Sequence, residues 1–345
     1  MITISLCMIV KNEEAVLARC LDSIAPLMDE IIIVDTGSTD RTKEIAARYN
    51  AKIYDYKWQD DFAAARNYCF SLASMEYIYS ADADEVLDTD NQERFALLKE
   101  AMLPEVELVQ MKYLTKNDFN TVLNFQEEYR PKLFRRLRTF SWIDPVHETV
   151  RLDPVVFDSD VEIIHLPQSL HSGRDFQCFL KAFAKDGQLS PRLHSMYAKE
   201  LLMTGTKEQF AESLPVFLHT MAQDTVSQDM RREASCVLAR HFRLNGNVNK
   251  FFKLTLKDTA VNPCSEICCE LGWYFQAADD YEEAALWFYN AAYETESILD
   301  VRTSGKLPLE GLCACYEHQG LHEQAEEYRR AAADWQLPRD ISSLA

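Results

Sequence analysis

Strand and helix patterns alternate through the first 85 residues, and this alternation limits the possible folds more than any other feature of the chain. Apolar runs with strand character, several of them rich in β-branched residues, occur at Ile2–Val10, Ile31–Val34, Ala51–Tyr56 and from Tyr77 onward. Ile31–Val34 has no polar alternation, which is typical of a strand buried on both faces. This order predicts an α/β domain with a mostly parallel sheet and crossover helices.

Helices are expected between these strands, and the first two each have a polar residue that can cap the start. The first runs from a cap at Asn12 to about Ile24, the second from a cap at Ser38 or Thr39 to Tyr49, and the third covers Phe62–Ser74. Glu14 falls in the first turn of the first helix, where the helix dipole favours negative charge. These caps complete the expected strand–helix units.

Two of the expected strands end in carboxylates. Asp35 follows Ile31–Val34, and Asp82 and Asp84 follow the fourth strand, with one alanine between them. The carboxyl ends of parallel strands are where α/β proteins bind ligands. If the chain stays extended, Asp82 and Asp84 project to the same side and can share one divalent cation. The alternative is a solvated turn that caps the next helix.

The residues around these acids favour a nucleotide as the ligand. Asp35 can accept hydrogen bonds from a base or ribose, while Gly37 and Ser38 let the backbone approach a ligand closely. Arg66 lies near the start of a helix of small residues, and its guanidinium can bind a phosphate or carboxylate. An arginine on a helix is also a common surface cation, so this interpretation depends on the acids nearby.

Four motifs occur in order through this half of the chain. They are Ser5-Leu6-Cys7-Met8-Ile9-Val10-Lys11-Asn12-Glu13-Glu14, Ile33-Val34-Asp35-Thr36-Gly37-Ser38-Thr39-Asp40, Asp61 to Asn67, and Asp82-Ala83-Asp84-Glu85. This series resembles the motifs of family-2 glycosyltransferases. It is most similar to members with an appended helical-repeat domain, which include sublancin-type peptide S-glycosyltransferases and flagellin glycosyltransferases. The motifs cover the first half of the chain, and the second half is similar in architecture only.

The resemblance implies a GT-A type nucleotide-sugar domain and a role for each matching residue. Asp84 would be the principal ligand of Mn²⁺ or Mg²⁺, and Asp82 would contact the metal or the ribose of a UDP-sugar. Asp35 would contact the uracil or ribose. Further nucleotide contacts are implied for Val10, Asn12, Glu14, Gly37, Ser38, Arg66 and Asn67.

A second group of motifs consists of Tyr129-Arg130-Pro131-Lys132-Leu133-Phe134-Arg135-Arg136 and Trp142-Ile143-Asp144-Pro145-Val146-His147-Glu148. It resembles the family's arginine-rich strand and the Val-His-Glu element after it. An inverting transfer needs a base that removes the proton from the attacking hydroxyl or thiol. Glu148 is the first candidate and His147 the second, since the pKa of imidazole suits proton transfer near neutrality. The alternative is that these two residues belong to a strand and a turn and have no catalytic role. Arg135 is a candidate for binding the diphosphate, and the alternative is that it belongs to a solvated basic edge of the sheet.

His165 closes the strand-like run Val161–His165, just before the composition becomes helical. Similar enzymes have a histidine near this point that completes the metal or diphosphate site, and imidazole is an acceptable ligand for manganese. A histidine at a strand end also has common structural roles. The chain departs from the family pattern in the next residues, Leu166-Pro167, where relatives tend to have a Gly-Tyr-like turn.

Helical patterns replace strand patterns after about Phe176, which predicts two domains, 1–172 and 173–345. Residues with small or apolar side chains recur 41 positions apart within the second domain: Leu271, Gly272, Phe275, Ala284 and Ala291 match Leu312, Cys313, Tyr316, Ala325 and Ala332. This spacing is similar to tetratricopeptide-like helical hairpins, with roughly four hairpins expected. Such an array presents a surface for a peptide or for a second copy of the chain, or simply caps the first domain.

Composition excludes several classes of function. A net charge of −19 disfavours nucleic acid and anionic lipid as partners and is compatible with a basic acceptor protein. No apolar run is long enough to span a membrane and the N-terminus lacks the order of a signal peptide, so a cytoplasmic location is expected. The ten cysteines are then expected to be reduced thiols in helix packing positions rather than zinc ligands.

These observations together predict a metal-dependent, inverting hexosyl- or N-acetylhexosaminyl-transferase. It would move a sugar from a nucleoside diphosphate donor, expected to be a UDP-sugar, to a Ser, Thr or Cys side chain of a peptide or protein. One alternative is an acceptor that is a glycan or a cell-surface polysaccharide precursor. Others are a nucleotidyltransferase, which needs more basic residues near the N-terminus, and a non-catalytic scaffold that binds nucleotide or peptide.

Overall fold

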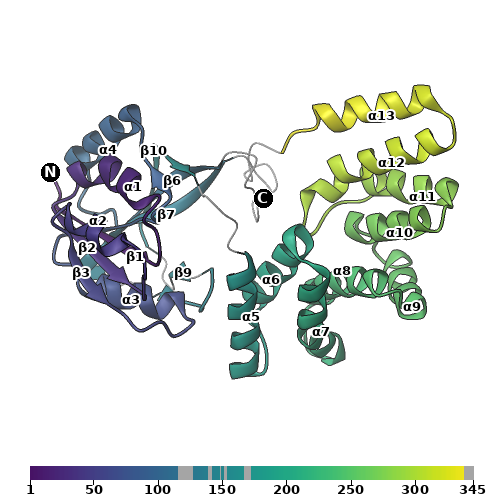
Figure 1. Ribbon diagram of the computed structural model, residues 1–345, viewed down its shortest axis with the longest axis horizontal. Helices are drawn as coiled ribbons and strands as arrows, with labels where there is room; N and C mark the ends of the chain where they lie inside the picture. The colour runs from purple at the N-terminus through teal and green to yellow at the C-terminus, as the bar shows by residue number, and fades with distance from the viewer. Residues whose placement is uncertain (116–126, 139–141, 148, 151–153, 167–171, 338–345) are drawn as a thin grey trace. The chain divides into compact units, whose positions relative to one another are not determined.

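The computed structural model describes residues 1–115, 127–138, 142–147, 149–150, 154–166 and 172–337 (Figure 1). These residues form two compact units: an α/β unit up to residue 166 and a helical unit from Ser172. The predicted fold classes of the two halves are therefore confirmed. The exact boundary at 172 stays a prediction, because residues 167–171 are outside the described part of the chain.

One sheet forms the centre of the α/β unit. Its strands, in spatial order, are β3 (Lys52–Asp55), β2 (Glu30–Asp35), β1 (Ile4–Val10), β4 (Tyr77–Ser80), β7 (Glu127–Arg135), β6 (Leu108–Thr115), β10 (Val156–His165) and β5 (Glu85–Val86). Only β7 and β5 are antiparallel to their neighbours, so the other strands of this sheet share one direction. The predicted mostly parallel sheet is therefore confirmed. β8 (Trp142–Ile143) and β9 (Thr149–Val150) pair with each other in a second, two-stranded sheet.

Helices cover both faces of the sheet, which explains the uninterrupted apolar strands. Ile4, Leu6 and Met8 of β1 pack in one core cluster, which also contains residues of α1 (Leu17–Ile24) and α4 (Thr89–Ala101). Cys7 points to the other face and packs with residues of α3 (Phe62–Ser71). Successive residues of a strand point to opposite faces, so β1 contributes to both clusters.

Two predicted helix starts are wrong. α1 begins at Leu17 rather than after Asn12, and α2 (Thr42–Ala47) begins after Arg41 rather than after Ser38 or Thr39. Asn12 has a left-handed backbone with φ 57°, and its side chain binds a neighbouring loop instead of a helix start. The polar residues read as caps thus serve the loops at the strand ends, as described below.

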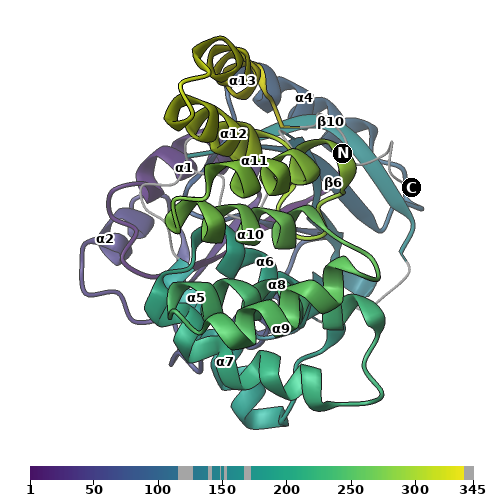
Figure 2. The ribbon, with the colours of Figure 1, turned by 90° about the vertical axis from the view of Figure 1, so that its right-hand side faces the viewer.

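The helical unit consists of α5 (Ser172–Asp186) followed by hairpins (Figure 2). In the described residues these are α6 (Pro191–Thr204) with α7 (Lys207–Ala222), α8 (Gln228–Leu244) with α9 (Val248–Thr259), α10 (Ser265–Ala277) with α11 (Tyr281–Tyr289), and α12 (Lys306–His318) with α13 (His322–Asp334). The prediction of about four hairpins is confirmed. None of the helices in the described residues is long and apolar enough to cross a bilayer.

The 41-residue repeat corresponds to helix packing positions. Leu271 and Leu312 are fully buried at equivalent places of α10 and α12, and Ala284 and Ala325 at equivalent places of α11 and α13. The 13-residue spacing of Leu271 and Ala284 also predicts a contact of Ala198 with Ala211, and this prediction fails because Ala211 is exposed and the neighbouring Phe210 is buried in its place. The small residues predicted at helix contacts therefore mark the last two hairpins best.

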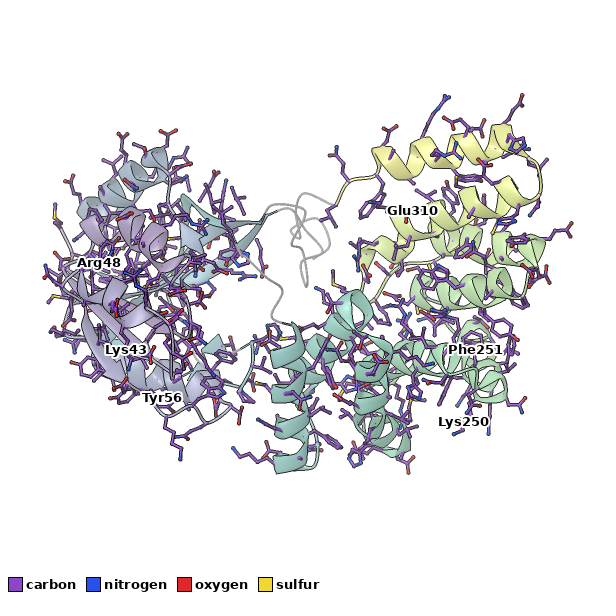
Figure 3. All side chains as sticks on the ribbon, in the orientation of Figure 1. Lys43, Arg48, Tyr56, Lys250, Phe251 and Glu310 are labelled. Carbon is purple, nitrogen blue, oxygen red and sulfur yellow. The ribbon has the colours of Figure 1, made fainter. Side chains whose placement is uncertain are left out.

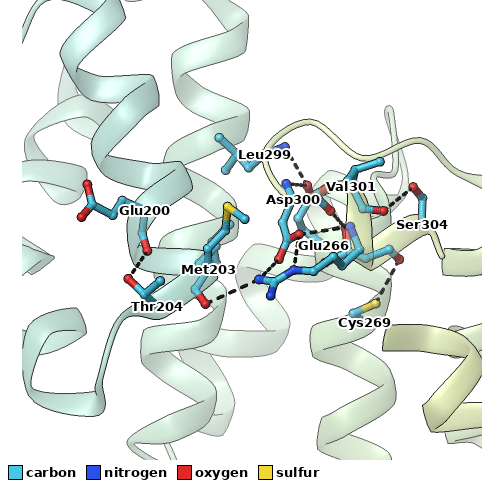
Figure 4. Close-up of polar contacts among 12 residues, drawn as sticks. Glu200, Met203, Thr204, Glu266, Cys269, Leu299, Asp300, Val301 and Ser304 are labelled. Carbon is cyan, nitrogen blue, oxygen red and sulfur yellow. Dashed lines mark hydrogen bonds and ion pairs between the residues drawn. The ribbon is translucent and has the colours of Figure 1, made fainter. Parts of the chain in front are cut away.

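The connection between α11 and α12 is held by a buried carboxylate (Figure 4). Glu266 of α10 accepts hydrogen bonds from the backbone N–H groups of Ile298, Leu299 and Asp300, at 2.7 to 3.2 Å. Cys236 and Cys264 lie close to this carboxylate, with their sulfur atoms 3.6 Å apart. Because Glu266 already satisfies three N–H groups of the connection, its position has a structural explanation without a ligand.

Candidate functional site

Asp35 lies at the carboxyl end of β2, where it organises the loop that follows. Its Oδ2 accepts hydrogen bonds from the N–H groups of Gly37 and Ser38, at 3.1 and 3.0 Å. Gly37 has φ 106°, a backbone conformation that favours glycine. Lys43 of α2 (Figure 3) brings its Nζ to 3.5 Å from the same oxygen. The second carboxylate oxygen, Oδ1, is buried without a hydrogen-bond partner among the described residues, so its capacity to accept a hydrogen bond is unused.

The loops after β1 and β2 are joined by reciprocal hydrogen bonds. Asn12 donates its backbone N–H to Ser38 Oγ (2.9 Å), and its side-chain oxygen accepts from the N–H of Thr39 (2.7 Å). Glu14 similarly accepts from the N–H of Arg41 (3.0 Å). These contacts explain the polar residues of both motifs and hold the Asp35 loop against the end of β1.

Asp82 and Asp84 follow β4 in a turn rather than in an extended segment. The carbonyl of Asp82 accepts a hydrogen bond from the N–H of Glu85 at 3.2 Å, which closes the turn. The expectation that both side chains project to one side of an extended chain is therefore wrong. The carboxylate of Asp82 is half exposed, whereas that of Asp84 is mostly covered.

His165 and Asp84 are brought together by the pairing of two distant strands. β5 pairs antiparallel with the end of β10, so that His165 is opposite Glu85. Nε2 of His165 lies 3.1 Å from Oδ2 of Asp84. The next residue, Leu166, donates its N–H to the carbonyl of Asp84 at 2.9 Å. The first residue of the departure from the family pattern therefore also contacts Asp84.

The Asp84–His165 pair fits a divalent cation. An octahedral ion with bonds of about 2.1 Å holds adjacent ligands about 3 Å apart, which matches the separation of these two atoms. Carboxylate oxygen and imidazole nitrogen are both ligand types for manganese. Among the described residues, the possible ligand atoms of Asp82, Asp84 and His165 do not all lie within 4.8 Å of one another. Asp82 is therefore placed beside this pair rather than within it.

Cations surround Asp82. Arg66 Nη2 is 3.8 Å from its Oδ1, and Arg66 also donates to the Ser80 hydroxyl and lies over the ring of Trp142. Burial raises the pKa of Asp82, but the charges of Lys132, Arg66 and Arg130 outweigh this effect, and the pKa is lowered from its ordinary value. The carboxylate is therefore ionised near neutrality and available to a cation.

A buried ion pair between Lys132 and Glu85 stabilises the turn at Asp82–Glu85. Lys132 of β7 contacts the carboxylate of Glu85 and donates to the carbonyl of Ser80 at 3.3 Å. Both side chains are more than nine-tenths buried. Burial raises the pKa of Glu85, and the charge of Lys132 offsets part of this shift. The pair thus links the loop that contains Asp82 and Asp84 to the neighbouring strand.

Three residues predicted to contact the nucleotide have other partners or positions in the structure. Arg135 is opposite Tyr77 at the start of β4, whereas Asp82 follows the end of that strand. The amide of Asn67 is occupied by the backbone of Trp142, as a donor at 2.9 Å and an acceptor at 2.7 Å. The side chain of Val10 is buried in the core cluster. Only the backbone carbonyl of Val10 reaches the adjacent loop, where it accepts from Thr36.

The candidate bases lie after β8. Glu148 is outside the described residues. His147 is half-buried and has a left-handed backbone with φ 47°, which is uncommon for a residue other than glycine and is often found at functional sites. This segment is connected to α3 through a hydrogen bond from the N–H of Phe62 to the carbonyl of Pro145.

Sequence reasoning missed Arg130, Lys132 and Tyr113 as site residues. Arg130 and Lys132 alternate along β7 and so point to the same face of the sheet. That spacing was visible in the sequence, but the antiparallel direction of β7, which decides which end reaches Asp82, was not.

Comparison with known proteins identifies a family for the first half of the chain. Residues 5–150 match the family model described as glycosyl transferase family 2. These residues form a glycosyl transferase family 2 domain. The four motifs, the Asp35 loop and the Asp82–Glu85 turn all fall within it, and the resemblance inferred from the motifs is confirmed.

Relatives of the chain include glycosyltransferases and a TPR repeat-containing protein. A TPR repeat-containing protein of Synechococcus elongatus is 48% identical over 87 residues, covering 25% of this chain and 22% of that protein. An uncharacterized glycosyltransferase of Rickettsia felis is 30% identical over 173 residues, covering 46% and 56%. The SPbeta prophage-derived glycosyltransferase SunS of Bacillus subtilis is 36% identical over 96 residues, covering 27% and 23%. The chain thus spans between about a fifth and just over half of the length of these relatives.

Proposed function

We propose that this protein is a metal-dependent, inverting glycosyltransferase that uses a UDP-sugar as donor and a Ser, Thr or Cys side chain of a peptide or protein as acceptor. The observation that carries this proposal is the 3.1 Å separation of Asp84 Oδ2 and His165 Nε2 within a family-2 domain. The similarity to SunS, a glycosyltransferase, supports the same reaction class.

The described residues have distinct roles in this proposal. Asp84 and His165 hold Mn²⁺ or Mg²⁺, and Asp82 contacts the metal or the ribose. A divalent cation there would neutralise the charge that develops on the leaving diphosphate. Asp35, with its unpartnered Oδ1, accepts a hydrogen bond from the uracil or ribose. Arg66 holds Asp82 in place through their ion pair.

The acceptor side of the reaction needs a base and a binding surface. Glu148 or His147 removes the proton from the attacking hydroxyl or thiol as the bond to the leaving diphosphate breaks. The hairpins of the helical unit offer a surface for the acceptor polypeptide, in the manner of other helical repeats. The charge of −19 favours a basic acceptor.

Nucleoside diphosphate release from UDP-, GDP- and TDP-sugars tests the proposal. The assay uses Mn²⁺, Mg²⁺ or a chelator, and compares the wild type with Asp84→Ala and with Asp90→Ala, an exposed carboxylate of α4. We expect metal-dependent release from a UDP-sugar by the wild type and by Asp90→Ala, and none by Asp84→Ala. Mass spectrometry of candidate peptides incubated with the preferred donor then identifies the modified side chain.

Other outcomes favour the alternatives. Turnover with a glycan and not with peptides would indicate a glycan or polysaccharide-precursor acceptor. Nucleotide binding without turnover, with acceptors supplied, would indicate a scaffold. No binding and no release under any metal would contradict the proposed function altogether.

A further inference from the structure

Tyr113 of β6 lies between three charged or titratable side chains from neighbouring strands. The guanidinium carbon of Arg130 is 3.9 Å from the centre of the Tyr113 ring, and Nζ of Lys132 is 5.4 Å from it. The imidazole of His165 lies on the same ring with a centroid separation of 5.1 Å. Tyr113 is 1% exposed, so its ring is a fixed element of the sheet.

Sheet order explains how one ring contacts all three. β6 lies between β7 and β10, so Arg130 and Lys132 approach from the β7 side and His165 from the β10 side. The cation–ring contacts are stabilising and hold the guanidinium of Arg130 against the Tyr113 ring. The Tyr113 ring is thus next to the side chain that contacts Asp84.

Arg130 and Lys132 differ in what they can still bind. Lys132 is buried and paired with Glu85. Arg130 has a side chain that is 37% exposed, and its ion pair with Glu128 is loose, at 3.6 Å. A guanidinium that is held against a ring and is partly exposed can make bidentate hydrogen bonds to phosphate oxygens. Arg130 therefore has donor groups available to a ligand where Lys132 does not.

The charge around the turn matches an anion once a metal is present. Asp82, Asp84, Glu85 and Glu128, the partner of Arg130, supply four negative charges, and Arg66, Arg130 and Lys132 supply three positive charges. A divalent cation added at Asp84 and His165 changes this balance from about one negative to about one positive charge, which favours an anion such as a diphosphate.

We infer that Arg130 binds the diphosphate of the nucleotide-sugar donor, and that Tyr113 is a positioning residue for Arg130 and His165. This inference rests on the proposed function. It replaces Arg135, which lies at the other end of β7, as the arginine for the diphosphate.

Binding of UDP and of uridine separates this role from a general structural one. Calorimetry measures the dissociation constant for UDP with Mn²⁺, and an NMR titration measures the weaker binding of uridine, which has no phosphate. We expect Arg130→Gln to weaken UDP binding roughly ten- to hundredfold and to leave uridine binding unchanged. Arg48→Gln removes an exposed arginine of the same unit (Figure 3) and should change neither.

Two substitutions of Tyr113 test the positioning role. Tyr113→Phe keeps the ring, and its affinity for UDP should be close to that of the wild type. Tyr113→Leu removes the ring and should weaken UDP binding roughly three- to tenfold. A Tyr113→Leu protein that keeps its helix and sheet content and binds UDP like the wild type would contradict the positioning role.

The failure of this inference is distinguishable from failure of the proposed function. If the wild type binds UDP and releases it from a sugar donor, but Arg130→Gln binds UDP equally well, only the inference is overturned. Equal losses for UDP and uridine in Arg130→Gln would also overturn it, because they indicate a change in the whole pocket. A wild type that binds no nucleotide would overturn both.

Discussion

Asp84 and His165 are 81 residues apart in the sequence, and their side chains approach to 3.1 Å at the edge of the sheet. The two-residue strand β5 makes this possible, because it places Glu85 opposite His165 on β10. A short edge strand thus joins the turn after β4 to the last strand of the unit. The contact depends on tertiary pairing between segments that are not neighbours in sequence.

If the two side chains hold one ion, their substitutions should not be additive. Asp84→Asn and His165→Ala should each weaken Mn²⁺ binding at least about tenfold, because each removes a ligand. The double variant should bind little more weakly than the worse single variant, since the site is already lost. Titration calorimetry with MnCl₂ in the presence of UDP measures all three.

Asp90→Asn is the matched control, since Asp90 is an exposed aspartate of α4 that has no part in the proposed site. Its Mn²⁺ affinity should equal that of the wild type. Losses in the two single variants that multiply in the double variant would show that the two side chains act separately, and would contradict a shared ion.

The stability of the α/β unit should depend on pH through Glu30. Burial alone would raise the pKa of Glu30, but hydrogen bonds from Lys52, Ser5 and Ser74 lower it to about 2. Because the folded pKa is depressed, the stabilisation is present above the ordinary pKa near 4.5 and is lost as the pH falls towards 2. Glu30→Gln should therefore lower the unfolding free energy at pH 7 by up to about 3 kcal/mol.

Urea denaturation of the full chain at several pH values checks this expectation. The midpoint difference between the wild type and Glu30→Gln should shrink steadily below pH 4.5. Glu93→Gln, an exposed glutamate of α4, should stay within about 0.5 kcal/mol of the wild type at pH 7. A difference for Glu30→Gln that is constant with pH would show that the effect comes from packing and not from its charge.

Gly272 should not tolerate a methyl group, although alanine favours helices more than glycine does. A Cβ atom at Gly272 would lie 2.7 Å from the ring of Phe288, which is fully buried between α10 and α12. A Cβ atom at Gly311 of α12 would also lie 2.7 Å from this ring. Gly272→Ala should therefore destabilise the helical unit by about 1 to 3 kcal/mol, seen as a lower melting temperature by circular dichroism at 222 nm.

A smaller residue at position 288 provides the control. Phe288→Leu alone should destabilise by leaving space at the helix contact. Gly272→Ala combined with Phe288→Leu should then cost less than the sum of the single effects, because the added methyl group occupies part of that space. Additive losses would mean that the ring does not limit residue 272.

Much of the site was predictable because its residues are local to strand ends. Asp35, Gly37 and Ser38 form one loop, and Asp82 and Asp84 form another, so their grouping follows from strand positions alone. The helix caps were misread because Asn12, Ser38 and Thr39 have hydrogen-bonding partners in a neighbouring loop. Residues of this type bind either a helix start or a loop, and local sequence does not distinguish the two.

The sequence by itself determined the α/β and helical-hairpin classes, the strand ends that bear carboxylates, and the family motifs. Tertiary structure alone decided that β7 runs antiparallel to β4, so that the charges of Arg130 and Lys132 act on Asp82 while Arg135 pairs with the start of β4. It also decided that His165 meets Asp84 and that Tyr113 lies beside both His165 and Arg130. The physical reason is that apolar periodicity is a local property of the chain, whereas the order and direction of strands depend on pairing between distant segments.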